Sequence, residues 1–392
     1  MQLTKKKPTT KKGSSFSFKK LGSKKQSSKS SSLISLDIGS FYTKMLVGKQ
    51  TGNTLIIESA LKEKTPNKAC ADGTVVNASS ITSTLNKVIS QSNTKTKDVV
   101  FTIESTKIIK REFVIHKIPE EDILGLVKHE MGQYLPIDIA GYSIQPSVTG
   151  SLSEDDGEKL KVSVNAVPKE MMKQYQQLLT SIGLNPVSMS LNSNSIEKLI
   201  IFDKKHNPHS EYSGKNVVFI DMGYSCFNIS VYEDGVYQFN RDIEVGGEKL
   251  DNMIADTLRI NLDEAQDVKV ELCSQINAVE LDQKYSTMPP SYEPKNTNDR
   301  VLSNLSATIN EWAGQIDKVL QYQIRSRGKN IDEIYLYGGS SLMSGIGGFF
   351  ESKLAIKTGY TGSVGYCKYP PNINPQDLFT IYGNAVGAFI KI

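Results

Sequence analysis

The chain has 392 residues, which predicts two or more domains at roughly 100–200 residues per domain. Its 38% hydrophobic and 22% charged residues are typical of a soluble globular protein, and no apolar run approaches the ~20 residues that span a bilayer. The net charge of +4 is unevenly distributed, because residues 1–32 contain ten lysines and no acid. The remainder is mildly acidic, so it lacks the basic surface of a nucleic-acid-binding protein.

Residues 1–32 have little to bury and are expected to be a disordered tail. One interpretation is a solvated leader. Another is contact with anionic lipids, with Phe16 and Phe18 inserted among the lysines; binding to nucleic acid is the weakest alternative. The tail has no apolar segment of the kind found in secretory signals. The four cysteines form no C-x-x-C pair, which argues against zinc or dithiol sites and favours a reducing cytoplasm: Cys70, Cys226, Cys273 and Cys367.

The first ordered half is predicted to mix strands and helices, starting with a β-meander that turns at Gly52. Helix starts are marked by Pro and acids, as at Pro119, and one helix end is marked by Gly183. The predicted strands are 33–37, 42–47, 54–60, 98–103, 107–116, 142–148, 161–167 and 186–191, and the helices are 79–90, 119–134, 168–182 and 194–202.

A polar stretch at 203–214 is predicted to link the two halves, and the second half then restarts in the style of the first. A helical region with a Pro-rich interruption spans about 263–327, and a helix follows Gly345. The other predicted elements are strands at 216–221, 227–232, 236–244 and 331–337 and a helix at 248–258.

Each half opens with the same frame: a buried strand, an Asp-x-Gly turn, a second strand, a glycine turn and a third strand. Asp37-Ile38-Gly39-Ser40 stands in the first half and Asp221-Met222-Gly223-Tyr224-Ser225 in the second. A period near 180 residues predicts two related lobes, expected to face each other across a cleft.

The two turns suggest a phosphate clamp, because glycine lets the backbone approach an anion and backbone N–H groups then point at it. Ser40 and Thr43 add hydroxyl donors and Lys44 adds positive charge. Asp37 and Asp221 fit ligands, direct or through water, of a Mg²⁺ shared with phosphates. A third turn, Gly338-Gly339-Ser340-Ser341, follows a buried strand and could admit a purine ring. The candidate phosphate-binding residues are Gly39, Ser40, Thr43, Lys44, Gly223, Tyr224 and Ser225.

These motifs resemble the superfamily of actin, sugar kinases and seventy-kilodalton chaperones, with a fourth match at Gly383-Asn384-Ala385-Val386-Gly387 for its closing helix. Within it, the sequence resembles the PilM family of type IV pilus assembly from about 33 to 392. Three stretches carry this match: 129–137 (His-Glu-Met-Gly-Gln-Tyr-Leu-Pro-Ile), 245–250 (Val-Gly-Gly-Glu-Lys-Leu) and 263–269 (Asp-Glu-Ala-Gln-Asp-Val-Lys).

The resemblance implies an α/β, actin-like (ribonuclease H-like) fold of two duplicated lobes, with the inserted subdomain shared by PilM and FtsA. It also implies ATP and Mg²⁺ as cofactors, and adds Gly246, Gly247, Gln266 and Lys269 to the expected ATP-binding residues. The implied parts are a first lobe core (33–97 and 184–210), an inserted subdomain (98–183), a second lobe core (211–250 and 331–392) and a helical subdomain (251–330).

The resemblance further implies a partner, the cytoplasmic N-terminal peptide of a PilN-like membrane protein, bound in a groove by the inserted subdomain. Other pilus assembly proteins and self-association are further expected contacts. The implied location is the cytoplasm, with recruitment to the inner face of the plasma membrane.

Two departures from the family bear on catalysis. Asn192 stands where relatives often carry a Glu that orients water, and an amide cannot act as a base. Gln266 likewise replaces a Glu near adenosine. We therefore expect an ATP binder with slow or absent ATPase activity. The alternatives are an FtsA-like or MreB-like filament protein, and a small-molecule kinase, which would need a catalytic Asp that the sequence does not reveal.

Overall fold

The computed structural model describes residues 16–17, 32–134, 138–154, 157–362 and 366–391, and the chain separates into two compact units. The change from the first unit to the second at Phe202–Asp203 falls where the polar linker was predicted to begin. Unit 1 comprises Met1–Phe202, Tyr366–Pro370 and Asn384–Ile392, and unit 2 comprises Asp203–Gly365 and Pro371–Gly383.

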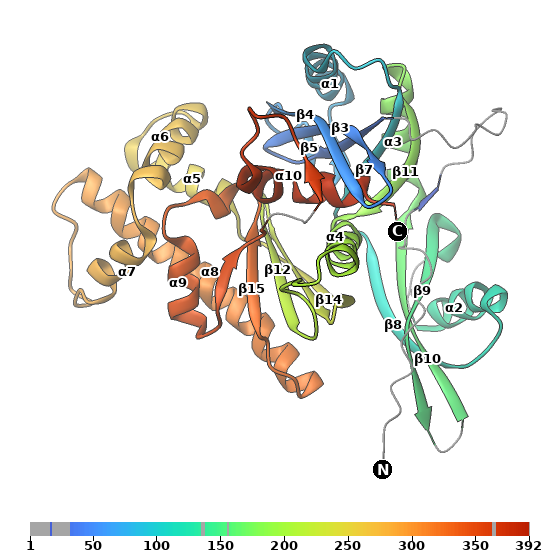
Figure 1. Ribbon diagram of the computed structural model, residues 1–392. Helices are drawn as coiled ribbons and strands as arrows, with labels where there is room; N and C mark the ends of the chain where they lie inside the picture. The colour runs from blue at the N-terminus through green and yellow to red at the C-terminus, as the bar shows by residue number, and fades with distance from the viewer. Residues whose placement is uncertain (1–15, 18–31, 135–137, 155–156, 363–365, 392) are drawn as a thin grey trace. The chain divides into compact units, whose positions relative to one another are not determined.

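Unit 1 is built on a seven-stranded sheet (Figure 1). In their order across the sheet, the strands are β1 (Phe16–Ser17), β11 (Asn185–Leu191), β7 (Asp98–Ile103), β2 (Leu33–Ile38), β3 (Tyr42–Thr51), β4 (Thr54–Lys64) and β17 (Cys367–Lys368). β2, β3 and β4 form the predicted antiparallel meander, and β7 and β11 run parallel to β2. The carboxyl ends of β2, β7 and β11 therefore lie at one edge of the sheet.

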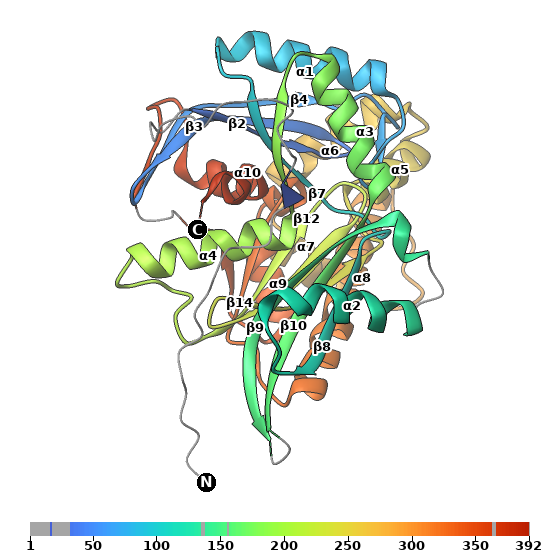
Figure 2. The same cartoon turned by 90° about the vertical axis from the view of Figure 1, so that its right-hand side faces the viewer.

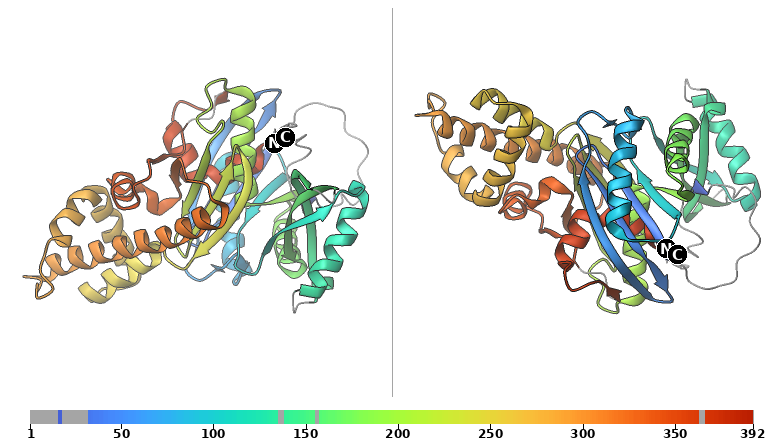
Figure 3. Two further views of the ribbon diagram at one scale, coloured as in Figure 1. Left: turned by 90° about the horizontal axis from the view of Figure 1, so that it is seen from below. Right: turned by 90° about the horizontal axis from the view of Figure 1, so that it is seen from above.

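The two faces of this sheet have different partners because side chains alternate along each strand. Ile34 and Leu36 face a hydrophobic cluster shared with α1 (Ala78–Ser92) and α3 (Lys169–Ser181); Figure 3 shows α1 along the blue strands. Ser35 faces the opposite side and donates a 2.7 Å hydrogen bond to Ala385 O in α10 (Pro375–Phe389). Asp37 belongs to the face of Ser35, so it projects away from the main core.

A separate sheet of three strands, in the order β8 (Ile109–His116), β10 (Gly157–Pro168), β9 (Tyr142–Glu154), forms an inserted subdomain in unit 1 (Figure 2). α2 (Glu120–Tyr134) covers it, and the short helix η1 (Ile139–Gly141) leads into β9. Its own apolar cluster includes Ile115, Val127 and Val162. The period-two pattern of β8 and β10 therefore builds a second core beside the first.

The boundaries of this subdomain are narrower than the predicted 98–183. β7 pairs with β2 in the main sheet, and α3 contributes Tyr175 and Leu178 to the main core. Sequence order alone did not show that both elements pack with the first lobe.

The chain also contains elements that the sequence did not predict. These are β1, β16 (Thr358–Tyr360), β17 and the small hairpin of β5 (Cys70–Ala71) and β6 (Thr74–Val75). β1 lies within the expected disordered tail, where Phe16 is buried; the prediction of disorder is therefore wrong at Phe16–Ser17, and the rest of the tail up to residue 31 lies outside the described residues. The 135–137 part of the quoted helix end and residues 155–156 of the acidic turn also lie outside them.

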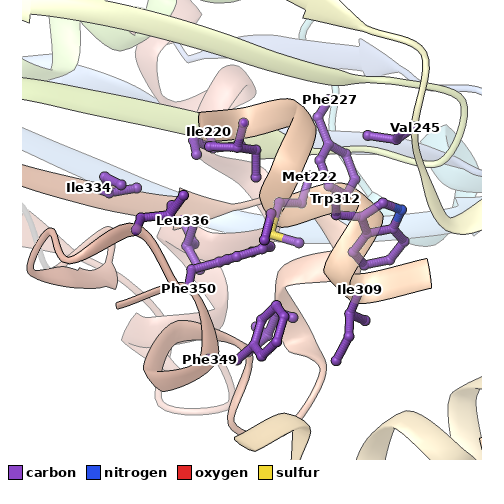
Figure 4. Packing of buried hydrophobic residues seen from close by; sticks show 14 of the residues in the cluster. Ile220, Met222, Phe227, Val245, Ile309, Trp312, Ile334, Leu336, Phe349 and Phe350 are labelled. Carbon is purple, nitrogen blue, oxygen red and sulfur yellow. The ribbon is translucent and has the colours of Figure 1, made fainter. Parts of the chain in front are cut away.

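Unit 2 has a five-stranded sheet in the order β14 (Val236–Ile243), β13 (Phe227–Glu233), β12 (Asn216–Met222), β15 (Glu333–Tyr337), β16 (Thr358–Tyr360). α8 (Thr297–Arg327), α9 (Ile346–Leu354) and one face of this sheet share a core in which Trp312 is fully buried. Figure 4 shows the indole beside Phe227, and the ring centroids lie 4.9 Å apart, edge to face. Burial of both faces explains why Val217–Ile220 is a continuous apolar run.

Helices precede and flank α8: α5 (Gly247–Leu258), α6 (Leu262–Gln275) and α7 (Ala278–Ser286). Three of these starts are N-capped by asparagine, as Asn261 accepts from Glu264 N, Asn277 from Val279 N and Asn296 from Asp299 N. A small apolar cluster of Ile254, Ala265 and Val301 packs α5, α6 and α8 together. Among the described residues, no helix has the length and hydropathy of a membrane span.

Candidate functional site

The first turn follows β2 and closes at Gly39, whose N–H donates to Tyr42 O at 3.1 Å. A Cβ on Gly39 would lie 3.0 Å from that same oxygen, so the turn favours glycine. Thr65, just after β4, donates from its hydroxyl to Gly39 O at 2.8 Å and from its N–H to Phe41 O. The turn is therefore supported from the end of the neighbouring meander strand.

Thr43 takes part in this support. It is fully buried and its hydroxyl lies 3.0 Å from the Thr65 hydroxyl. Because Thr65 uses its proton on Gly39 O, Thr43 is the donor of this bond. The Thr43 proton is thus used inside the turn, which differs from the phosphate-donor role that the sequence predicted.

Asp37 and Lys44 stand opposite each other on β2 and β3, and Lys44 Nζ lies 3.0 Å from Asp37 Oδ2. Both side chains are largely buried. The described residues contain no group of three or more His, Cys, Asp or Glu side chains close enough to hold a metal. A Mg²⁺ at Asp37 would therefore take most of its ligands from phosphate and water, which is the usual arrangement for this ion.

Two further residues, Glu104 and Asn192, lie at the carboxyl edge of the parallel strands beside Asp37. Glu104 directly follows β7 and forms a 2.9 Å ion pair with Lys110, and both side chains are nearly buried. Lys110 also donates to Ser193 Oγ at 3.4 Å, next to Asn192 at the start of α4 (Asn192–His206). The sequence reasoning weighed Asn192 and missed Glu104, although its position as the first residue after a buried strand was a usable signal.

The second turn repeats the first. A Cβ on Gly223 would lie 2.7 Å from Cys226 O, so the turn between β12 and β13 is as tight as that of Gly39. Helix α5 supports it, because Gly247 N donates to Gly223 O at 3.2 Å and Glu248 N to Tyr224 O at 2.9 Å. A Cβ on Gly246 would lie only 2.1 Å from Tyr224 O. Gly246 and Gly247 thus permit close approach of helix and turn, and the Gly247 amide is used within the protein.

The third turn also packs against the second. Gly338 has φ +90°, and a Cβ there would lie 2.5 Å from Asp221 Oδ1. Ser340, in the short helix η2 (Gly339–Leu342), donates to Gly223 O at 3.1 Å. Gly339 has open space around its Cα, since a Cβ there would meet nothing within 4 Å. Unit 2 therefore brings together the predicted Asp221, Gly223, Gly338 and Ser340.

A polar cluster extends this group through α5 and α6. Lys269 Nζ lies 2.6 Å from the fully buried Asp251, 3.4 Å from Gly247 O and 5.1 Å from the centre of the Tyr224 ring. Gln266 donates to the Tyr224 hydroxyl at 3.3 Å. Gln266 and Lys269, expected near a nucleotide, thus surround the Tyr224 side chain, and Asp251 is a member that the sequence reasoning missed.

Burial governs the electrostatics of this cluster. It raises the pKa of the Asp251 carboxyl above its usual value and outweighs the opposing effect of Lys269. Burial and the nearby Asp251 also raise the pKa of the Tyr224 phenol. Tyr224 is therefore a neutral ring at physiological pH, and Lys269 is placed over it by an ion pair that is closed to solvent.

Comparison with known proteins gives concordant findings. A family model described as "Type IV pilus assembly protein PilM" matches residues 35–382. The "Cell division protein FtsA" of Borreliella burgdorferi is 24% identical over 291 residues, 70% of this chain and 64% of that protein, so the match spans less than two thirds of that relative.

Two solved structures are similar in fold. The "PilM-PilN type IV pilus biogenesis complex" superposes with a TM-score of 0.75 at 16% identity, over 91% of this chain and 97% of that one. The ethanolamine utilization protein EutJ from Carboxydothermus hydrogenoformans gives a TM-score of 0.47 at 12% identity, over 90% and 88%. The first match confirms the actin-like fold that the family resemblance implied.

Proposed function

This chain belongs to the PilM family of type IV pilus assembly proteins, and from that premise we propose that it is a scaffold that binds Mg-ATP with slow or absent turnover. The observation that carries the proposal is the repeated turn, in which Gly39 packs on Tyr42 O and Gly223 on Cys226 O. Each follows an aspartate at the end of a buried strand. Each turn is proposed to bind phosphate, and the group around Gly338 and Lys269 to bind adenosine.

Slow turnover is proposed because the structure offers Asn192, and not a carboxylate, at the start of α4. An amide can hold water by hydrogen bonds but cannot accept its proton. Glu104, a carboxylate on the same edge, is held in an ion pair with Lys110. These groups suit retention of a nucleotide better than its rapid hydrolysis.

The proposed partner is the N-terminal cytoplasmic peptide of a PilN-like membrane protein, since the solved complex that this fold resembles pairs PilM with PilN. Such a partner would recruit the chain to the inner face of the plasma membrane. Binding of the nucleotide is proposed to set the conformation that the peptide meets.

Calorimetry of Mg-ATP binding tests the nucleotide part. Asp37→Asn and Asp221→Asn should each weaken binding by about tenfold or more, as expected for loss of a metal-linked carboxylate. Asp256→Asn, on the exposed side of α5, is the matched control and should bind normally. Unchanged affinity in both turn variants would reject the site.

A peptide-binding measurement tests the partner separately. A fluorescent peptide of the PilN-like protein's cytoplasmic N-terminus should bind the purified chain, and a scrambled peptide should not. A chain that binds Mg-ATP but not this peptide would remove the partner and leave the nucleotide site standing.

A further inference from the structure

The N-terminal segment supplies a strand that the sequence did not predict. Phe16–Ser17 pairs antiparallel with β11, with Phe16 opposite Met189 and Ser17 opposite Ser188. Figure 1 draws β1 as a short blue arrow beside β11. The Phe16 side chain is only 5% exposed and belongs to the main hydrophobic cluster of unit 1, together with Met189 and Tyr175.

The place where β1 docks is the outer edge of the seven-stranded sheet. β11 is paired with β7 on its other side, so β1 is the element that covers its outer N–H and C=O groups. An uncovered edge strand is a template for pairing with an extended peptide. Met189 and Leu191 of β11 are fully buried, which gives the edge an apolar floor for an aromatic side chain.

The contact is short compared with the other pairings of the sheet. It consists of two ladder residues and one buried aromatic ring, whereas β11 and β7 pair over their full length. The sequence around Phe16 is rich in lysine and has no acid from 1 to 32. Residues 18–32 separate Ser17 from β2, so docking within one chain benefits from a high effective concentration.

We propose that the outer edge of β11 is a strand-docking site that takes an extended peptide with a phenylalanine anchor, and that its occupant is the Phe16–Ser17 segment of this chain. While it is docked, the segment covers the outer backbone groups of β11. When it is displaced, these groups are free to pair with an extended peptide. The site is independent of the nucleotide proposal, because none of its residues belongs to the predicted turns.

The choice of variant depends on the register in which the N-terminal segment pairs with β11. Side chains two positions apart in a strand point to the same face, so a two-residue slip of a Phe16→Ala chain would offer Phe18 in place of Phe16. The informative variant is therefore the full-length chain with Phe16→Ala and Phe18→Ala together. Val76→Ala, whose side chain is 63% exposed, is the matched control for loss of an apolar side chain.

The probe is a fluorescent peptide of residues 11–22, followed by anisotropy against each full-length protein. The double variant should bind the peptide at least about tenfold more tightly than the wild type and the control, because its own segment no longer competes. Amide exchange of 185–191 should be faster in the double variant and slow again when the peptide is added. Equal peptide binding by wild type and double variant, or unchanged exchange at 185–191, would overturn the proposal.

Discussion

The Asp37 turn of unit 1 and the Asp221 turn of unit 2 share one backbone design with different side-chain partners. Asp221 lies 184 residues after Asp37, and the same spacing separates Gly223 from Gly39. The residue opposite the aspartate on the next strand is Lys44 in unit 1 and Asn228 in unit 2. The first turn therefore carries its own cation, whereas Asn228 donates to the Asp242 carboxylate on β14.

The support beneath the two turns differs as well. Gly39 O accepts one hydroxyl bond, from Thr65 at the end of the same meander. Gly223 O accepts two bonds, from Gly247 N at the start of α5 and from the Ser340 hydroxyl of the third turn. A duplicated frame can thus keep its backbone geometry while one copy specialises in charge and the other becomes the meeting point of three segments.

The largest effect is expected at Gly338, where the backbone packs closely against Asp221 in unit 2. Gly338→Ala would force a Cβ to within 2.5 Å of Asp221 Oδ1 at φ +90°, and should lower the free energy of unfolding by about 3 kcal/mol or more. Gly339→Ala, the adjacent control with open space, should change it by less than about 1 kcal/mol. Urea unfolding followed by circular dichroism measures both, and equal effects would contradict the close packing at Gly338.

The next largest effect is expected at the two lysine–aspartate ion pairs, Lys269–Asp251 and Lys44–Asp37. Lys269→Met leaves the fully buried Asp251 without its cation, and should lower the free energy of unfolding by about 3 kcal/mol. Lys44→Met leaves Asp37, whose side chain is 10% exposed, and should cost about 1 kcal/mol. The same urea titration applies, without nucleotide present. A larger loss of unfolding free energy in Lys44→Met than in Lys269→Met would contradict the conclusion that Lys269–Asp251 is the more buried pair.

A smaller effect compares the supports of the turn carbonyls. Thr65→Val removes the described hydroxyl bond to Gly39 O and should cost about 1–2 kcal/mol. Ser340→Ala should cost about 0.5 kcal/mol, because Gly247 N still donates to Gly223 O. Thermal unfolding of the two variants ranks them, and a larger loss for Ser340→Ala would show that the helix amide is not an adequate substitute.

The smallest effect concerns the pH dependence of stability at Asp299, in the first turn of α8. Hydrogen bonds from Tyr285 and Tyr292 and from the Lys295 N–H hold the pKa of the Asp299 carboxyl well below its usual range. A depressed pKa contributes stability that is present above the unfolded value near 4 and is lost as pH falls through the folded value. The difference in unfolding free energy between wild type and Asp299→Asn should therefore be constant near neutrality and shrink below about pH 4. A difference that stays constant down to pH 2 would be inconsistent with this linkage.

Local pattern predicted most of the elements near the site. The strand before each aspartate, the hairpin at Gly52 and the helix after Gly246 are confirmed, because alternation, turn glycines and helix starts depend on neighbouring residues. The extent of the inserted subdomain was wrong, since nothing local distinguishes β7, which pairs with β2, from β8, which starts a new sheet. The roles of the nucleotide-contact residues stay predictions.

The sequence by itself determined the duplicated frame and the family, because an Asp-x-Gly turn between two buried strands needs only a few adjacent residues and recurs at a fixed spacing. Tertiary structure decided which side chains surround those turns. Thr65 and Asp251 became visible only after folding, since their partners Gly39 and Lys269 lie on other elements of the fold. The same holds for Phe16. Its lysine-rich surroundings predict an exposed side chain, but the ring is buried because it packs at the apolar edge of the sheet.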